Sequence, residues 1–145
     1  MCSTEAGIDL VSISQTAAML DASGQAYRDM CWSSAEQAYC GESAARYAVR
    51  WAAKEAVMKA LGRGIGEVDP LDIEVVAVEG QRPALRLSGS ASAFAEQAGV
   101  ALTLSMSHEA DLATALVVAT RCCTTYAPAH PVRTGNNFDE PSGRR

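Results

Sequence analysis

Two carboxylates and one lysine in this chain are the residue types that phosphate chemistry requires. Asp9 lies in the middle of the apolar stretch GIDLVSI, and Glu55 and Lys59 lie in RWAAKEAVMKA. Aspartate is depleted in strand interiors, and a half-buried carboxylate needs a partner. Two carboxylates are too few to enclose calcium, but they suit Mg2+, which keeps several waters and takes further ligands from phosphates. We therefore predict that Asp9 and Glu55 bind Mg2+ and that the Lys59 ammonium neutralises charge on a transferring phosphate.

The spacing of Glu55 and Lys59 also allows a simpler interpretation. Residues four apart face each other on a helix, and such an ion pair stabilises an exposed helix by about 0.2–0.5 kcal/mol. However, the only lysines in the chain are Lys54 and Lys59, and its other basic residues are all arginines. Because a compact ammonium and a planar guanidinium bind phosphate differently, this restriction of lysine favours the phosphate interpretation.

These residues lie in one long predicted helix. Residues 43–61 contain neither glycine nor proline, and Gly41 and Gly62 bracket them. The pattern predicts a helix of about 19 residues, about 28 Å long at 1.5 Å per residue. This helix is expected to be the centre of the domain.

A projection at 100° per residue separates the charged side chains of this helix into two groups. Arg46, Arg50 and Lys54 fall on one basic stripe, on which an acidic partner could dock. Glu55 and Lys59 fall on a different side, among small and apolar residues, where unpaired charge would be costly.

The remaining elements follow from apolar periodicity and from turn residues. We predict strands over 7–13, 72–79, 83–89, 102–108 and 112–120, short helices over 14–21 and 33–40, a helix over 90–99, a capping box of Ser33 and Glu36, and a turn over 80–82. This order predicts an α+β fold in which a small antiparallel sheet packs on one long central helix and shorter helices. His108 is in phase with the apolar residues of its strand, which predicts that it points inward, as a structural histidine or a substrate contact.

The domain is expected to end well before the chain does. From Arg121 onward, RCCTTYAPAHPVRTGNNFDEPSGRR loses all periodicity and collects proline, glycine and asparagine. We predict one domain over residues 1–120 and a disordered tail over 121–145.

Composition excludes several classes of protein. A formal net charge of −5 argues against nucleic-acid binding. There is no run of about 18 apolar residues, and MCSTEAGIDL lacks the pattern of a signal peptide, so we expect no membrane association and a cytoplasmic location. Five cysteines without a C-x-x-C pair argue against a disulfide framework and a zinc site.

Two stretches resemble a known family. GID at residues 7–9 and RWAAKEAVMKALGRGIG at 50–66 are similar to holo-[acyl-carrier-protein] synthase, the small single-domain class of 4'-phosphopantetheinyl transferase. DIEVV, a turn with Gly80 and Pro83, and SMSHEADLATALVVA extend the resemblance to about Ala6–Thr120.

The resemblance implies a phosphopantetheinyl-transferase-like fold and a homotrimer with active sites between subunits. It implies Mg2+-dependent transfer of phosphopantetheine from coenzyme A to a serine of an acidic apo acyl carrier protein, releasing adenosine 3',5'-bisphosphate. The carrier could serve fatty-acid, polyketide or peptide synthesis. By this resemblance Asp9 and Glu55 are metal ligands, and they are catalytic together with Lys59, which lies near the pyrophosphate. The coenzyme contacts that it implies are Arg50, Lys59, Gly62, Pro83 and His108.

Two other classes of function remain open from the residues. One is a non-catalytic homologue that binds a carrier protein or coenzyme A. The other is an unrelated Mg2+-dependent phosphate hydrolase that shares only the paired carboxylates. Retention of Asp9, Glu55 and Lys59 together disfavours the first, and the scarcity of histidine as a water-positioning group disfavours the second.

Overall fold

The computed structural model describes residues 2–77 and 80–121. Within these ranges, no helix combines the length and the apolar character needed to cross a membrane. In chain order, the elements are β1 (Ser3–Ser12), α1 (Ile13–Cys31), α2 (Ser34–Cys40), α3 (Ala44–Ala60), the 3-10 helix η1 (Pro70–Asp72), β2 (Ile73–Val76), β3 (Ala84–Leu87), α4 (Gly89–Ala98), β4 (Ala101–Glu109) and β5 (Leu112–Arg121).

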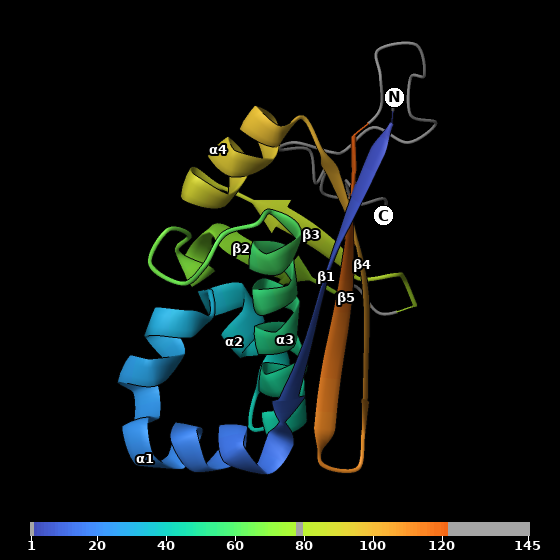
Figure 1. The fold of residues 1–145 in the computed structure, drawn as a ribbon. Coiled ribbons are helices and arrows are strands. Elements are labelled where there is room, and N and C mark those ends of the chain that lie inside the picture. The colour runs from blue at the N-terminus through green and yellow to red at the C-terminus, as the bar shows by residue number, and fades with distance from the viewer. Residues whose placement is uncertain (1, 78–79, 122–145) are drawn as a thin grey trace, which may run out of the picture.

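The strands form two antiparallel sheets. The larger sheet has the order β1-β5-β4, so β5 is central, and β2 pairs with β3 in a separate two-stranded sheet. Figure 1 shows α3 lying along one face of the larger sheet, with α1 and α2 on the far side of α3. The predicted α+β fold, with a small antiparallel sheet on one long helix, is confirmed.

Most predicted elements are present, with three differences. The first strand was predicted over 7–13, but β1 begins at Ser3 and ends at Ser12, and Ile13 begins α1. The first helix was predicted to end near residue 21, and α1 consists of two helical segments that meet at Gly24, whose φ of 59° and ψ of −142° are not helical. The glycine therefore ends the first helical segment, and the second segment, which reaches Cys31, is the part that the sequence pattern missed. The 3-10 helix η1 was missed; Asp69 caps it and Pro70 begins it. Arg121, the first residue of the predicted tail 121–145, is the last residue of β5; the rest of that tail and the end of the predicted strand 72–79 lie outside the described residues.

Small residues allow α3 to approach the sheet closely. The main core places the α3 alanines against Ala115, Val117 and Ala119 of β5. Gly7 on β1 is the closest point, because a Cβ atom there would lie 2.6 Å from Ala60 N and would overlap the Ala56 carbonyl oxygen. This contact fixes β1 against the C-terminal half of α3 and sets the position of the residues that follow Gly7.

The predicted basic stripe on the long helix is wrong. Arg46 is exposed, but Arg50 is 2% exposed and Lys54 is fully buried. Lys54 Nζ lies 2.8 Å from Glu36 Oε2, and it donates to the carbonyl oxygens of Pro70 and Ile73 at 2.8 and 2.6 Å. The helical projection gave the correct direction for Lys54 but could not show that α2 and η1 cover that side.

Glu36 completes this buried network. Its Oε1 accepts from Val75 N at 3.0 Å, and its Oε2 accepts from Ser33 N at 2.9 Å, which forms the predicted capping box. A buried charge is tolerated when it is paired and hydrogen-bonded in this way. Lys54 and Glu36 therefore join α2, α3, η1 and β2, and Lys54 has a structural role.

Candidate active site

Asp9 and Lys59 form an ion pair between β1 and α3. Lys59 Nζ donates to Asp9 Oδ1 at 2.8 Å and to the carbonyl oxygen of Ile8 at 3.0 Å. The Asp9 side chain is 16% exposed, whereas that of Lys59 is 51% exposed. The hydrogen bond to Asp9 raises the pKa of Lys59, and desolvation opposes this effect. Lys59 thus pairs with the strand and not with Glu55, contrary to the simpler interpretation of the i, i+4 spacing.

Glu55 lies close enough to this pair to interact with both charges. Its side chain is half-buried on α3. Burial raises the pKa of Glu55, the negative charge of Asp9 raises it further, and the positive charge of Lys59 lowers it. The three residues predicted from the sequence therefore form one group of interacting charges.

The donor set of this group fits a hard divalent cation. Asp9 and Glu55 supply carboxylate oxygens, which Mg2+ prefers, and their mutual repulsion would be relieved by a cation bound to both. No cluster of three or more His, Cys, Asp or Glu side chains suited to a metal occurs in the described part of the chain. A metal held by these two carboxylates would need its other ligands from water or from a substrate, as Mg2+ takes from phosphates.

A second group of predicted residues surrounds a cavity of about 390 Å³ beside β4. The Arg50 guanidinium lies 4.3 Å from the centroid of the Tyr39 ring, and that of Arg46 lies 5.1 Å from the same ring. Arg50 Nη1 donates to the carbonyl oxygen of Arg46 at 3.3 Å, while Nε, although buried, has no partner in the described residues. Two cations stacked on one aromatic ring make this cavity suitable for an anion.

Pro83 and His108 also line this cavity. His108 is exposed, so the prediction that it lies out of open solvent is wrong, although it faces the cavity that Val49 and Arg50 of α3 also line. It lies near the end of β4, and its pairing partner on β5, Ala113, is buried against Ala48 and Val49 of α3. Tyr39 was missed by sequence reasoning, because nothing in its spacing indicates that α2 places it against Arg46 and Arg50.

Gly62 belongs to the end of α3. Its φ is 65°, Gly62 N donates to Lys59 O at 3.1 Å, and Arg63 N donates to Met58 O at 2.9 Å. These two bonds form a Schellman motif, which ends the helix. Gly62 thus turns the chain away directly after Lys59.

The two groups lie on opposite sides of α3. Arg50 and Lys59 are nine residues apart, which corresponds to about 180° around the helix. Asp9 belongs to the edge strand β1, and His108 belongs to the opposite edge strand β4. One chain therefore does not bring all the predicted site residues together.

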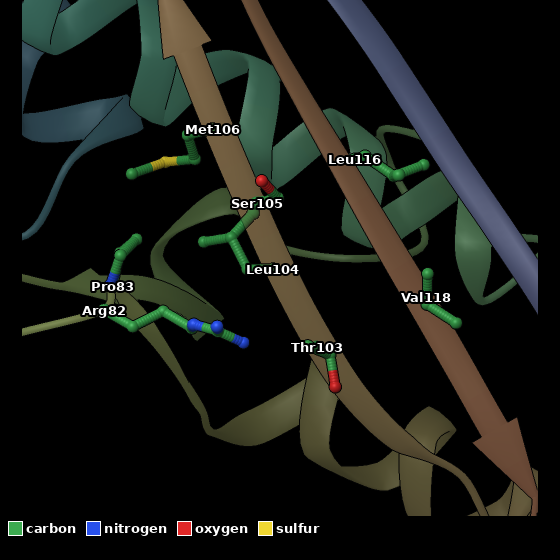
Figure 2. A pocket seen from close by; sticks show the side chains of 8 residues that line it. All are labelled: Arg82, Pro83, Thr103, Leu104, Ser105, Met106, Leu116 and Val118. Carbon is green, nitrogen blue, oxygen red and sulfur yellow. The ribbon is translucent and has the colours of Figure 1, made fainter.

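A second cavity, of about 300 Å³, opens over β4 and β5. Figure 2 shows the Arg82 side chain extending toward β4, with Pro83 beside it. None of the predicted catalytic residues lines this cavity. Its lining residues are Arg82, Pro83, Thr103, Leu104, Ser105, Met106, Leu116 and Val118.

Comparison with protein families agrees with this architecture. Residues 5–117 match the family described as the 4'-phosphopantetheinyl transferase superfamily. The holo-[acyl-carrier-protein] synthase of Chloroflexus aurantiacus is 42% identical over 130 residues, which covers 78% of this chain and 95% of that protein. The holo-[acyl-carrier-protein] synthase of Gloeobacter violaceus is 40% identical over 116 residues, covering 77% of this chain and 88% of that protein.

Solved structures show the same fold. The Chronobacterium ammoniagenes ACPS in complex with CoA matches with a TM-score of 0.74 at 30% identity, covering 83% of this chain and 99% of that one. The Helicobacter pylori holo-[acyl-carrier-protein] synthase in complex with coenzyme A matches with a TM-score of 0.71 at 30% identity, covering 79% and 98%. The chain is thus an enzyme that belongs to the 4'-phosphopantetheinyl transferase superfamily, as a member of its holo-[acyl-carrier-protein] synthase group.

Proposed function

We propose that this chain transfers the 4'-phosphopantetheine group of coenzyme A to a serine of an apo acyl carrier protein. The observation that carries the proposal is the group of Asp9, Glu55 and Lys59, in which two carboxylates and an ammonium interact at the junction of β1 and α3. Family membership and the CoA complexes of related proteins support the same reaction.

In this reaction the serine oxygen forms a bond to the phosphorus that bears pantetheine. The bond from that phosphorus to the bridging oxygen breaks, and the bridging oxygen leaves with adenosine 3',5'-bisphosphate. The serine proton must pass to a base, and Glu55 is a candidate because burial and Asp9 raise its pKa. Lys59 is exposed enough to reach the pyrophosphate and to neutralise charge as it develops on the leaving group.

We propose Asp9 and Glu55 as the Mg2+ ligands of this enzyme. When bound, Mg2+ supplies Lewis-acid neutralisation of the phosphate oxygens. The chain's own contribution is to hold both carboxylates in place. Gly7 fixes β1 on α3, and Thr114 Oγ1 donates to the carbonyl oxygen of Asp9 at 2.9 Å.

The cavity beside Arg50 is the proposed site for the nucleotide end of coenzyme A. That end carries a phosphate and a flat base, which match two guanidinium groups and the Tyr39 ring. His108 and Pro83 line the same cavity. The Arg50 Nε, buried with no partner in the described residues, is an available donor for such an anion.

A homotrimer with its active sites between subunits explains why the two groups lie on opposite sides of α3. In such an assembly, Asp9, Glu55 and Lys59 of one subunit face Arg50 and His108 of its neighbour. The face of the sheet opposite α3 supports association, because it exposes Ile8 (63%), Leu10 (62%) and Leu116 (42%). Ile8 and Leu116 are direct partners in the β1–β5 pairing, so these side chains form one patch.

Mass spectrometry of a carrier protein tests the proposed function. Incubation of apo acyl carrier protein with coenzyme A, MgCl2 and the enzyme should add one phosphopantetheine group to the carrier and release adenosine 3',5'-bisphosphate. A phosphate hydrolase would degrade coenzyme A without changing the carrier's mass. A non-catalytic binding homologue would leave both molecules unchanged, and either result would contradict the proposal.

A further inference from the structure

The Lys59 ammonium is held at β1 by two oxygens of different kinds. It donates to the Asp9 carboxylate at 2.8 Å and to the Ile8 carbonyl at 3.0 Å, although half of its side chain is exposed. In the described residues, Lys59 is the one cation that forms an ion pair with Asp9. The charge of Asp9 is thus already neutralised by a group on the same side of α3 as Glu55.

A divalent cation on Asp9 and Glu55 would meet this ammonium. Two positive centres that share one carboxylate repel each other strongly in a partly desolvated site. The Lys59 side chain has several rotatable bonds and an exposed stem, so it can leave Asp9 without moving α3. The buried Lys54, which is held by three acceptors, has no such freedom.

We propose that Lys59 and the divalent cation compete for Asp9, and that cation binding releases the ammonium to the pyrophosphate of coenzyme A. This inference rests on the proposed function, because it takes Asp9 and Glu55 as the metal ligands. Lys59 then lowers the affinity for Mg2+ when coenzyme A is absent, and it regains a partner when the pyrophosphate is present. Mg2+ and coenzyme A therefore bind with positive coupling, which is reciprocal by linkage.

The lysine content of the chain permits a direct measurement. Lys54 and Lys59 are the only lysines, so protein labelled with 15N at lysine Nζ gives two ammonium signals, and Lys59→Gln assigns them. Titration with MgCl2 alone should shift or broaden the Lys59 signal as the ion pair opens, while the Lys54 signal stays in place. If Mg2+ binds by calorimetry but the Lys59 signal does not change, the inference is wrong.

Calorimetry with matched variants tests the coupling. Lys59→Gln should bind Mg2+ without coenzyme A at least about fivefold more tightly than the wild type, and coenzyme A should increase its Mg2+ affinity by a smaller factor than in the wild type. Arg63→Gln is the control, because it removes a nearby positive charge that pairs with Glu67 and not with Asp9; its Mg2+ affinity should change less than about twofold. Equal effects of the two variants would overturn the competition. Failure of every form to bind Mg2+ would instead overturn the metal assignment in the proposed function.

Discussion

Lys54 and Glu36 form an ion pair in which the N–O distance is 2.8 Å and both side chains are fully buried. Lys54 has two further acceptors and Glu36 has two backbone donors, so the pair has no unsatisfied group in the described residues. Removal of one partner leaves a buried charge without its counterion.

The first prediction concerns this pair. Lys54→Met should lower the free energy of unfolding by about 3–5 kcal/mol, measured by urea denaturation. The matched control is Lys59→Met, which breaks a pair that is half exposed and should cost less than about 1 kcal/mol. Similar losses for the two variants would show that Lys54 is not the structural lysine of the chain.

The second prediction concerns the contact of β1 with α3. Gly7→Ala should destabilise the fold by about 1–3 kcal/mol, because the added Cβ meets backbone atoms of α3 that cannot move aside. Gly64→Ala is the control, since a Cβ there meets no atom within 4 Å. A melting temperature of Gly7→Ala equal to that of the control would contradict the close approach.

The third prediction concerns stability at alkaline pH. Burial raises the pKa of the Cys40 thiol from 9.0 to about 11, and the nearby Arg50 charge opposes the shift. Between these two values the folded protein keeps a proton that the unfolded chain loses. This contribution to stability is fully present below pH 9 and is lost as the pH rises toward 11, with a slope of up to about 1.4 kcal/mol per pH unit. Under reducing conditions, Cys40→Ala should show a shallower decline over this range than the wild type. Equal slopes would contradict the assignment.

The fourth prediction concerns the site between subunits. Asp9→Ala removes one half of the proposed site, and the double variant Arg50→Gln/His108→Ala removes the other, so each should be inactive alone. Co-expressed with different tags and purified through both, they should regain activity, because about one interface in three of each mixed trimer contains both intact halves. Mixed oligomers that are folded but inactive would show that the two groups do not act on one substrate.

Much of the fold could be predicted because the chain marks its elements clearly. Gly41 and Gly62 delimit α3, and Ser33 with Glu36 marks the start of α2. Asp9, Glu55 and Lys59 could be grouped because an aspartate inside a strand and two charges on an apolar helix side are each costly alone. The structure shows that these three residues lie close together, whereas their roles in metal binding and catalysis stay predictions.

Other features depend on contacts between elements, which the periodicity of a single helix or strand does not reveal. Lys54 was placed on a basic stripe because the projection shows direction but not which element covers that side. His108 was expected to be shielded from solvent, because alternation gives the direction of a side chain but not how far its neighbours cover it. Arg50 and Lys59 lie in the same short motif, but they project from opposite sides of α3. The diameter of the helix therefore separates them and divides the site into two groups.

The decisive measurement for the group of Asp9, Glu55 and Lys59 is the rate at which Asp9→Ala modifies a carrier protein. The measurement is the initial rate of phosphopantetheine transfer to apo acyl carrier protein, by mass spectrometry with coenzyme A and MgCl2, beside a melting curve of the same sample. We expect a loss of at least about a hundredfold in rate, because the proposed metal site and the partner of Lys59 are removed together, with little change in melting temperature. A rate near that of the wild type would contradict the assignment of Asp9, Glu55 and Lys59 as the catalytic group.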